Sequence, residues 1–325
     1  MMCFCILREE KLRERLEETE NCMTTTRILV TRNIKIFMRD KAAVFFSLLS
    51  MLIMLVLMLL FLGSMNSDTI MNILLEYGGK RDTLADQANA EHLVRVWTLA
   101  GLLLVNCMTV PMSVMSNLIQ DEETGRLASF YVAPVSRVRI TLGYILSAWF
   151  IGAGISLLTL TLGNIFLMTN DSGLRMQTCL SLTGMILVNS FFYASFAYLL
   201  SLFVHSSSAW SALLSLAGTL VGFLGAAYLP MAMLPDKVGT VLKALPILHG
   251  AAMMRRVSVQ EALVDTFAGL PAEVIEGYSE GMGITVSVNG EILSITQQMV
   301  FVVTLGIVIT AAAAFITWKR SGRDR

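Results

Sequence analysis

The chain has 325 residues, of which 55% are hydrophobic and 15% charged, whereas soluble domains carry about a quarter charged residues. The formal net charge is zero and the mean hydropathy is +0.68, so no global field favours nucleic acid or an acidic partner. These values exclude an ordinary soluble domain and predict an all-α integral membrane protein.

The N-terminal segment, residues 1–23, is rich in charged residues and is expected to lie in the cytoplasm. It lacks the short apolar core of a cleavable signal peptide, and Met23 is an alternative start of the chain. The five cysteines show neither metal-ligand spacing nor a disulfide framework. We expect all of them to be reduced and structural: Cys3, Cys5, Cys22, Cys107 and Cys179.

Residues 24–41 are predicted to form an amphipathic helix at the cytoplasmic interface. On a helical wheel the basic residues share one side and the apolar residues the other, which is typical of a helix whose basic face meets lipid headgroups. The alternative is a positively charged flank that only fixes topology. The basic side consists of Arg27, Arg32, Lys35 and Arg39.

Six apolar runs reach the roughly 20 residues that a helix needs to cross a bilayer. Five of them lie within residues 42–233 and the sixth at residues 299–318. Lys and Arg are frequent in the flanks on one side, including the tail at residues 319–325, so both termini are predicted to be cytoplasmic. The spans are Ala42–Gly63, Val94–Ile119, Ile140–Met168, Met176–Val204, Ala209–Met233 and Met299–Trp318.

The cytoplasmic loop at residues 120–139 is the most informative segment. Asp121, Glu122 and Glu123 stand where a helix N-terminus would favour negative charge, and apolar residues follow at helical spacing until Pro134 ends the element. A short amphipathic helix between two spans suits a peripheral cytoplasmic partner. A charged loop without such a role is the alternative.

Residues 234–298 form a long loop that is expected to be external and to have its own structure. Pro235 and Pro246 bound two predicted short helices near the membrane surface. Alternating apolar residues on both sides of Asn289-Gly290 predict a small β-hairpin, because a type I′ turn needs positive φ at both central positions.

Several span residues favour either helix packing or a substrate path. Gly218 and Gly222 permit close backbone approach, inside one subunit or across a dimer. Pro111 is expected to kink the second span. Asn106 and Asn189 are polar, and interhelical hydrogen bonding is the favoured interpretation, with a path-lining role as the alternative.

The chain lacks the residues that other functions need. It has no G-x-x-x-x-G-K-[ST] motif for ATP, no buried acid pair for a proton relay, and no nucleophile and base at membrane depth. We therefore expect no catalytic, cofactor-binding or metal-binding residue in this chain.

Three segments resemble ABC-2-type transporter permeases. Arg-Asn-Ile-Lys-Ile-Phe-Met-Arg-Asp-Lys, residues 32–41, is similar to the segment that leads into the first span of that family. Glu122-Glu-Thr-Gly…Pro134-Val-Ser is similar to its acidic-Thr-Gly…Pro-x-Ser loop. Leu234-Pro…Leu245-Pro…His249…Arg255 resembles its Pro-bounded short helices. Residues 8–20 and 258–298 match no pattern of the family.

The resemblance implies the membrane-spanning subunit of a bacterial ABC exporter that pairs with a second copy or a related permease. A separate ABC ATPase would bind ATP and Mg²⁺ and drive it, and the second and fifth spans would line the path and the subunit contact. The cargo stays open among a drug, a peptide, a lipid and a polysaccharide precursor. The implied ATPase-coupling residues are Asp121, Glu122, Glu123, Thr124, Gly125, Arg126 and Pro134.

An ion-coupled secondary transporter or channel is the alternative function, and a membrane-embedded enzyme or assembly factor is a third. Spans without ionisable groups offer no obvious site for a coupling ion, although half-helix backbones can bind one. We expect a multi-pass protein of the bacterial plasma membrane with lipid contacts and no nucleic-acid partner.

Overall fold

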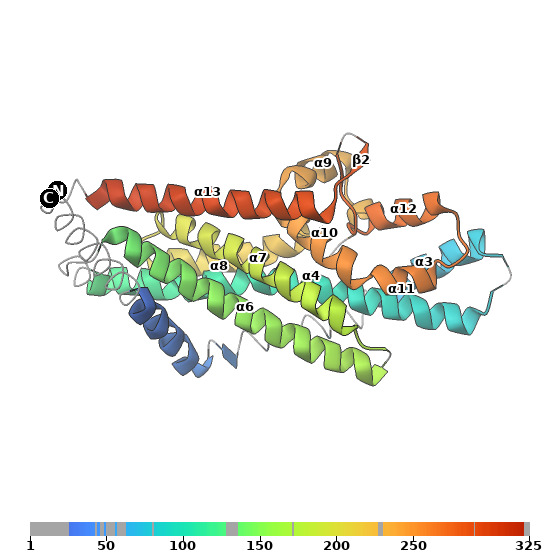
Figure 1. Cartoon of the computed structure of the whole chain (residues 1–325), viewed down its shortest axis with the longest axis horizontal. Coiled ribbons are helices and arrows are strands. Elements are labelled where there is room, and N and C mark those ends of the chain that lie inside the picture. The colour runs from blue at the N-terminus through green and yellow to red at the C-terminus, as the bar shows by residue number, and fades with distance from the viewer. Residues whose placement is uncertain are drawn as a thin grey trace, which may run out of the picture.

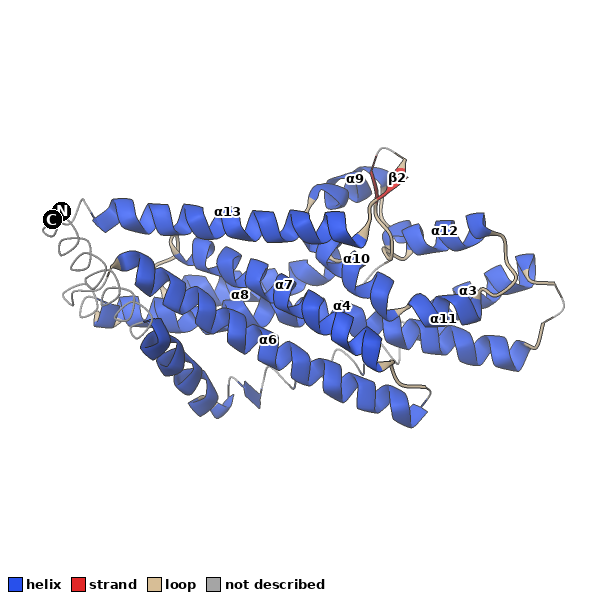
Figure 2. Cartoon of the chain, in the orientation of Figure 1, coloured by secondary structure: helices blue, strands red, loops and turns tan. Residues whose placement is uncertain are grey.

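The structure is a computed structural model that describes residues 26–42, 44–45, 49, 56, 63–79, 81–127, 136–170, 172–226, 230–288 and 290–321. Within these residues the chain forms an elongated bundle of helices with one small hairpin (Figures 1 and 2). The predicted all-α membrane fold with an added hairpin is confirmed.

The elements follow one another along the chain as helices interrupted by a single pair of strands. A helix at residues 26–39 comes first. The others are α3 (Gly63–Tyr77), α4 (Thr83–Glu123), α6 (Arg137–Asn170), α7 (Met176–Ser201), α8 (Ser207–Leu224), η2 (Met231–Met233), α9 (Asp236–Ala244), α10 (Pro246–Ser258), α11 (Gln260–Thr266), α12 (Ala272–Gly281), β1 (Ser287–Val288), β2 (Glu291–Ile292) and α13 (Ile295–Ser321).

Five helices in the described part of the chain are long and apolar enough to cross a membrane: α4, α6, α7, α8 and α13. They correspond to five of the six predicted spans, and the remaining one, residues 42–63, lies mostly outside the described residues. The fifth predicted span is too long. Its helix ends at Leu224 rather than Met233, because Ala226 has a φ of 50°, a left-handed conformation that cannot continue a helix.

The bundle has two distinct ends (Figure 1). The basic end contains helix 26–39, the last turns of α4, α7 and α13, and the first turns of α6 and α8. The cap, at the other end, contains α3, η2, α9, α11, α12 and the hairpin. Between the cap and the bundle lies α10, which contacts α4, α7 and α13.

The central helix is α4, which contacts α3, α6, α7, α8, α10 and α11. In the most apolar 18-residue stretch of α4, 89% of the residues are buried, whereas in that of α13 the share is 17%. The sequence predicted only Val94–Ile119, but the helix has 41 residues and, at 1.5 Å per residue, is roughly 60 Å long. That is about twice the thickness of a hydrocarbon layer, so α4 continues from the bundle into the cap.

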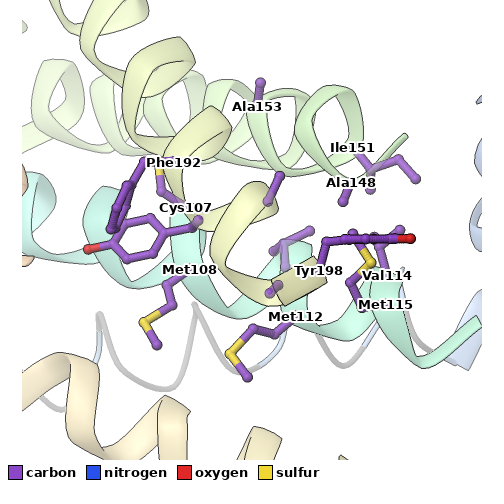
Figure 3. Close-up of a cluster of buried hydrophobic side chains, with 14 of the residues drawn as sticks. Cys107, Met108, Met112, Val114, Met115, Ala148, Ile151, Ala153, Phe192 and Tyr198 are labelled. Carbon is purple, nitrogen blue, oxygen red and sulfur yellow. The ribbon is translucent and has the colours of Figure 1, made fainter. Parts of the chain in front are cut away.

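The largest hydrophobic core lies where α4, α6 and α7 meet (Figure 3). Its buried side chains include Cys107 and Met115 of α4, Ile151 of α6, and Phe192 and Tyr198 of α7. Lipid is as apolar as these side chains, so the core stabilises the bundle through close packing rather than through removal from water. The flexible methionines suit this task because they fill irregular gaps.

At Pro111, α4 approaches α6 closely. A Cβ on Gly152 would lie 2.6 Å from Pro111 Cγ, so only glycine fits beside the proline ring. Helix α4 continues through Pro111 without a break. The backbone of α6 therefore provides the space into which the ring packs.

The polar span residues make contacts within this chain. Asn106 Nδ2 donates a hydrogen bond to Thr159 Oγ1 at 2.7 Å, which joins α4 to α6. Asn189 is fully buried, and a Cβ on Gly250 would lie 2.2 Å from its Oδ1. The backbone of α10 thus reaches α7 at this point. These contacts favour helix packing as the role of both asparagines.

The glycines of α8 face the interior of the same chain. A Cβ on Gly218 would lie 3.8 Å from Thr109 of α4, and Gly222 is buried. Trp210 Nε1 also donates to the carbonyl oxygen of Met112 at 3.1 Å. This face of α8 is therefore occupied by α4, and its opposite face is exposed.

The cap has a hydrophobic core of its own, formed by α3, the first half of α4, α11 and α12. The rings of Phe267 and Tyr278 meet there at 4.8 Å between centroids. The sequence predicted α9 and α10 as two short helices, but it gave no indication of α3, α11 or α12. Their amphipathic patterns are short and lie between Gly and Pro residues, which are typical of loops.

The predicted hairpin is confirmed. Ser287 pairs with Ile292 and Val288 with Glu291 in an antiparallel register, and Gly290 in the turn has a φ of +85°. The Glu280 carboxylate anchors the hairpin to α9, because it accepts hydrogen bonds from the Lys243 ammonium at 2.8 Å and from the Ser287 hydroxyl.

Replacing Gly152 with alanine is expected to lower the melting temperature of the purified protein, because the new Cβ meets Pro111. Overpacking of a core costs about 1–3 kcal/mol. The matched control is Gly154→Ala on the same helix, where an added Cβ meets nothing within 4 Å. Equal melting temperatures for the two variants in one detergent would contradict the close approach.

The hydrogen bonds from Lys243 and then Ser287 lower the pKa of Glu280. A carboxyl group whose pKa is lower in the folded state stabilises the fold above its unfolded pKa, and this stabilisation is lost as the pH falls through the folded value. We expect the hairpin of the parent protein to become protease-sensitive as the pH falls through the pKa of Glu280 in the folded state. Glu280→Gln should be sensitive already at neutral pH, and the exposed control Glu276→Gln should follow the parent.

Candidate functional site

The candidate site is the junction at the basic end, which we define as residues 121–127 and their contacts. The sequence predicted that the acidic residues begin a helix, and this is wrong: α4 ends at Glu123, so they occupy its last turn. Gly125, with a φ of +71°, ends the helix. The negative end of the helix dipole disfavours acids there, so each acid needs a positive partner from another element.

Asp121 finds that partner in Arg32. Arg32 Nη1 lies 2.7 Å from Asp121 Oδ2, and Nη2 donates to Oδ1 at 2.8 Å, so the guanidinium binds both carboxylate oxygens. Tyr144 of α6 also donates to Oδ2, at 2.7 Å. The Asp121 side chain is only 4% exposed, and its hydrogen bond raises the pKa of Arg32. One buried carboxylate therefore joins helix 26–39, α4 and α6.

Helix 26–39 packs against α6 through the face that includes Leu29 and Asn33, both of which are buried. Asn33 Nδ2 donates to Ser147 Oγ at 3.0 Å. A Cβ on Gly143 would lie 3.0 Å from Leu29 Cβ, so glycine lets the two helices approach. This helix is thus attached to protein along one side.

The basic residues of helix 26–39 separate into two groups. Arg27, Lys35 and Arg39 are exposed, as a face toward headgroups requires. Arg32 was predicted to belong with them, and the structure corrects this, because its guanidinium is bound to Asp121. The wheel placed Arg32 on the basic side with the other three residues, and periodicity alone could not identify its partner.

Glu122 and Glu123 link the end of α4 to the connection between α7 and α8. Glu123 accepts hydrogen bonds from the backbone N–H of Ser207, at 2.6 Å, and from its hydroxyl group. These groups lie at the N-terminus of α8, where a carboxylate is favoured by the helix dipole. Glu122 Oε1 lies 2.9 Å from His205 Nδ1. The segment that follows α4 and the connection between α7 and α8 therefore form one surface.

The other predicted coupling residues have simpler environments. Thr124 Oγ1 donates to the carbonyl oxygen of Gln120 at 2.7 Å, within α4. The Arg126 guanidinium is largely exposed and lies 3.9 Å from Asp121. An added Cβ at Gly125 would meet nothing within 4 Å. Pro134 lies outside the described residues.

A cavity of about 60 Å³ lies beside the junction, between α4, α6, α7 and α13. Its lining includes the ionisable residues Glu122, Arg137, His205 and Arg320, and Arg320 Nη1 donates to the carbonyl oxygen of Leu202 at 3.0 Å. The last turn of α4 and the first turn of α6 thus meet beside this cavity rather than in a packed core.

Sequence reasoning missed Tyr144, His205 and Ser207 as members of this site. Their elements meet α4 only after folding, so nothing in the local pattern assigns them. One signal was available for Arg32. An aspartate buried in the last turns of an apolar helix needs a compensating charge, and helix 26–39 is one of the basic segments predicted on the same side of the membrane.

Arg32→Met is expected to destabilise the purified protein strongly, because it leaves Asp121 buried without its counter-charge. Removal of one partner from a buried pair typically costs about 3–5 kcal/mol. The double variant Arg32→Met/Asp121→Leu should recover part of the loss, since apolar residues can replace a buried pair. Lys35→Met, on the exposed side of the same helix, is the control, and a melting temperature shared by Arg32→Met and this control would contradict the assignment.

A family model described as ABC-2 family transporter protein matches residues 81–315, which is more than half of the chain and runs from the residues before α4 into α13. No curated protein matches the chain. The matched region contains residues 121–127, helices α9 to α12 and most of the described spans. The chain therefore belongs to the ABC-2 transporter family and is a multi-pass membrane permease of an ABC-type transporter.

Proposed function

We propose that this permease is the membrane-spanning subunit of an exporter in the bacterial plasma membrane, and that a separate ABC ATPase drives it. The basic end then faces the cytoplasm and the cap faces outward. The distribution of charge supports this orientation, because Arg137, Lys319 and Arg320 flank spans at the basic end and such residues favour the cytoplasmic side.

The junction is the observation that carries the proposal. A short segment after α4 is bonded to helix 26–39 and α6 through Asp121, and to the start of α8 through Glu123. Gly125 and Arg126 remain accessible at its surface. A partner that displaced this segment would therefore displace several elements of the permease together.

The displacement has a continuous route to the cap. One helical element, α4, runs from the junction into the cap, and α8 is attached to it at Glu123 and again at Met112, through Trp210. Nucleotide binding by the ATPase would thus move α4 and α8 as a unit and open the two ends of the path alternately. The cavity lined by Glu122 and Arg320 gives the junction room to shift.

A second permease copy or a related permease would complete the exporter. In α8 only 22% of the residues in the apolar stretch are buried, so the outward face of this helix must meet lipid or protein. Ser211, Ser215 and Thr219 recur on that exposed face at four-residue spacing, and small residues at this spacing permit close helix contact. ATP and Mg²⁺ would bind to the ATPase, and the exported substrate would be a drug, peptide, lipid or polysaccharide precursor.

Glu123→Ala and Gly125→Pro are expected to reduce, several-fold, both the amount of ATPase that co-purifies with the permease and its ATP hydrolysis. The first variant detaches α8 from the junction, and the second changes a backbone that has a positive φ. Membrane insertion should remain normal. Glu276→Ala, an exposed acid of the cap, is the control, and parental hydrolysis in both junction variants would remove the junction from the mechanism.

The orientation is tested separately by a single cysteine at Thr124. In intact cells it should resist a membrane-impermeant maleimide, and it should react after the membrane is opened. A cysteine at the exposed cap residue Glu276 should react in intact cells. Labelling of Thr124→Cys from outside would place the junction beyond the reach of any cytoplasmic ATPase.

A further inference from the structure

Arg255 of α10 is a cation with no exposed surface. Among the residues that the structure describes, no carboxylate compensates its charge. Removing a charge from water is costly unless other groups replace the lost hydration. The compensation must therefore come from groups other than acidic side chains.

Two main-chain carbonyl groups take the place of a carboxylate. Arg255 Nη2 donates to the carbonyl oxygen of Ala226 at 2.7 Å, and Nη1 donates to that of Gly283 at 3.4 Å. Ala226 follows the C-cap of α8, Gly283 follows the C-cap of α12, and Arg255 is itself in the last turn of α10. Each helix C-terminus carries roughly half a negative charge, so three helix ends together compensate the guanidinium.

Both carbonyl groups belong to residues with left-handed backbone. Ala226 has a φ of 50° and Gly283 a φ of +63°, and Ala226 is the only non-glycine residue with positive φ in the described part of the chain. Such a conformation is strained for a residue with a side chain. A Cβ on Gly283 would lie 3.0 Å from Arg255 Nη1, so glycine is needed where α12 ends against the guanidinium.

The same guanidinium contacts α4. Its Cζ lies 4.6 Å from the centroid of the Trp97 ring, a cation–π contact that is stronger when it is desolvated. Trp97 Nε1 in turn donates to the carbonyl oxygen of Met282 at 2.9 Å. Helices α4, α8, α10 and α12 therefore meet at one side chain.

We propose that Arg255 is a positioning residue that fastens the cap to α4 and α8, so that these helices and the cap move as one body during transport. The movement rests on the proposed function, whereas the fastening rests on the contacts above. A lysine would not reproduce it, because its compact ammonium lacks the planar fork whose separate nitrogens reach the two carbonyl groups while Cζ lies over the indole ring.

The test uses the full-length permease with its co-purified ATPase in lipid nanodiscs. The native cysteines are replaced by serine, and Ser279 of α12, which is 3% exposed, is replaced by cysteine. The maleimide labelling rate of this cysteine is measured with and without ATP and Mg²⁺. In the parent protein it should be slow both with and without nucleotide, because a cap that moves with α4 and α8 as one body keeps this position buried. In Arg255→Met it should be fast in both conditions, while ATP hydrolysis persists.

Arg256→Met is the matched control, because this neighbouring arginine, among the described residues, bonds only the carbonyl oxygen of Leu293, at 2.9 Å. It should label like the parent. If Arg255→Met does not fold, Gly283→Ala disturbs the guanidinium without removing its charge. Its own control is Gly269→Ala, which has the same kind of backbone, with a φ of +83°, and open space for a Cβ.

Parental labelling rates in both Arg255→Met and Gly283→Ala would overturn the proposal. So would a several-fold rise in the labelling rate of the parent when nucleotide is added and ATP is hydrolysed. A permease that never binds an ATPase would refute the proposed function instead. The fastening would then be decided by the labelling rates without nucleotide.

Discussion

The ion pair between Arg32 and Asp121 is the contact on which the basic end depends. A carboxylate in the last turn of α4 is disfavoured by the negative helix end and, once buried, has lost its hydration. Arg32 compensates for both losses, and in doing so it attaches helix 26–39 to the bundle. With α4 able to end there, Glu122 and Glu123 come within reach of the connection between α7 and α8.

Charges at helix ends organise the molecule more generally. Glu123 lies at the positive end of α8, and Arg255 lies at the negative ends of α8, α10 and α12. In both cases the backbone supplies the opposite charge, so neither group needs a second ionised side chain beside it. This arrangement suits a bundle whose apolar spans carry no acidic or basic residues at their centres.

The sequence predicted the features that depend on local pattern. Apolar length identified five described spans, and Asn289-Gly290 identified the hairpin. It failed where neighbours decide the outcome. The acidic residues after Ile119 were assigned to a helix start, because no local signal shows that α4 continues to Glu123. Arg255 stood out only within the family resemblance, since the carbonyl groups that bind it come from helices distant in the sequence.

The length of α4 has a consequence for how this protein meets water. The helix begins at Thr83, and the turns before Val94 add roughly 16 Å beyond the apolar stretch. They carry α11, which packs on α4, beyond the apolar stretch on a continuous helix rather than on a flexible tether. An antibody fragment raised against α11 would therefore dock outside the detergent or lipid belt and would add a rigid, recognisable mass for imaging.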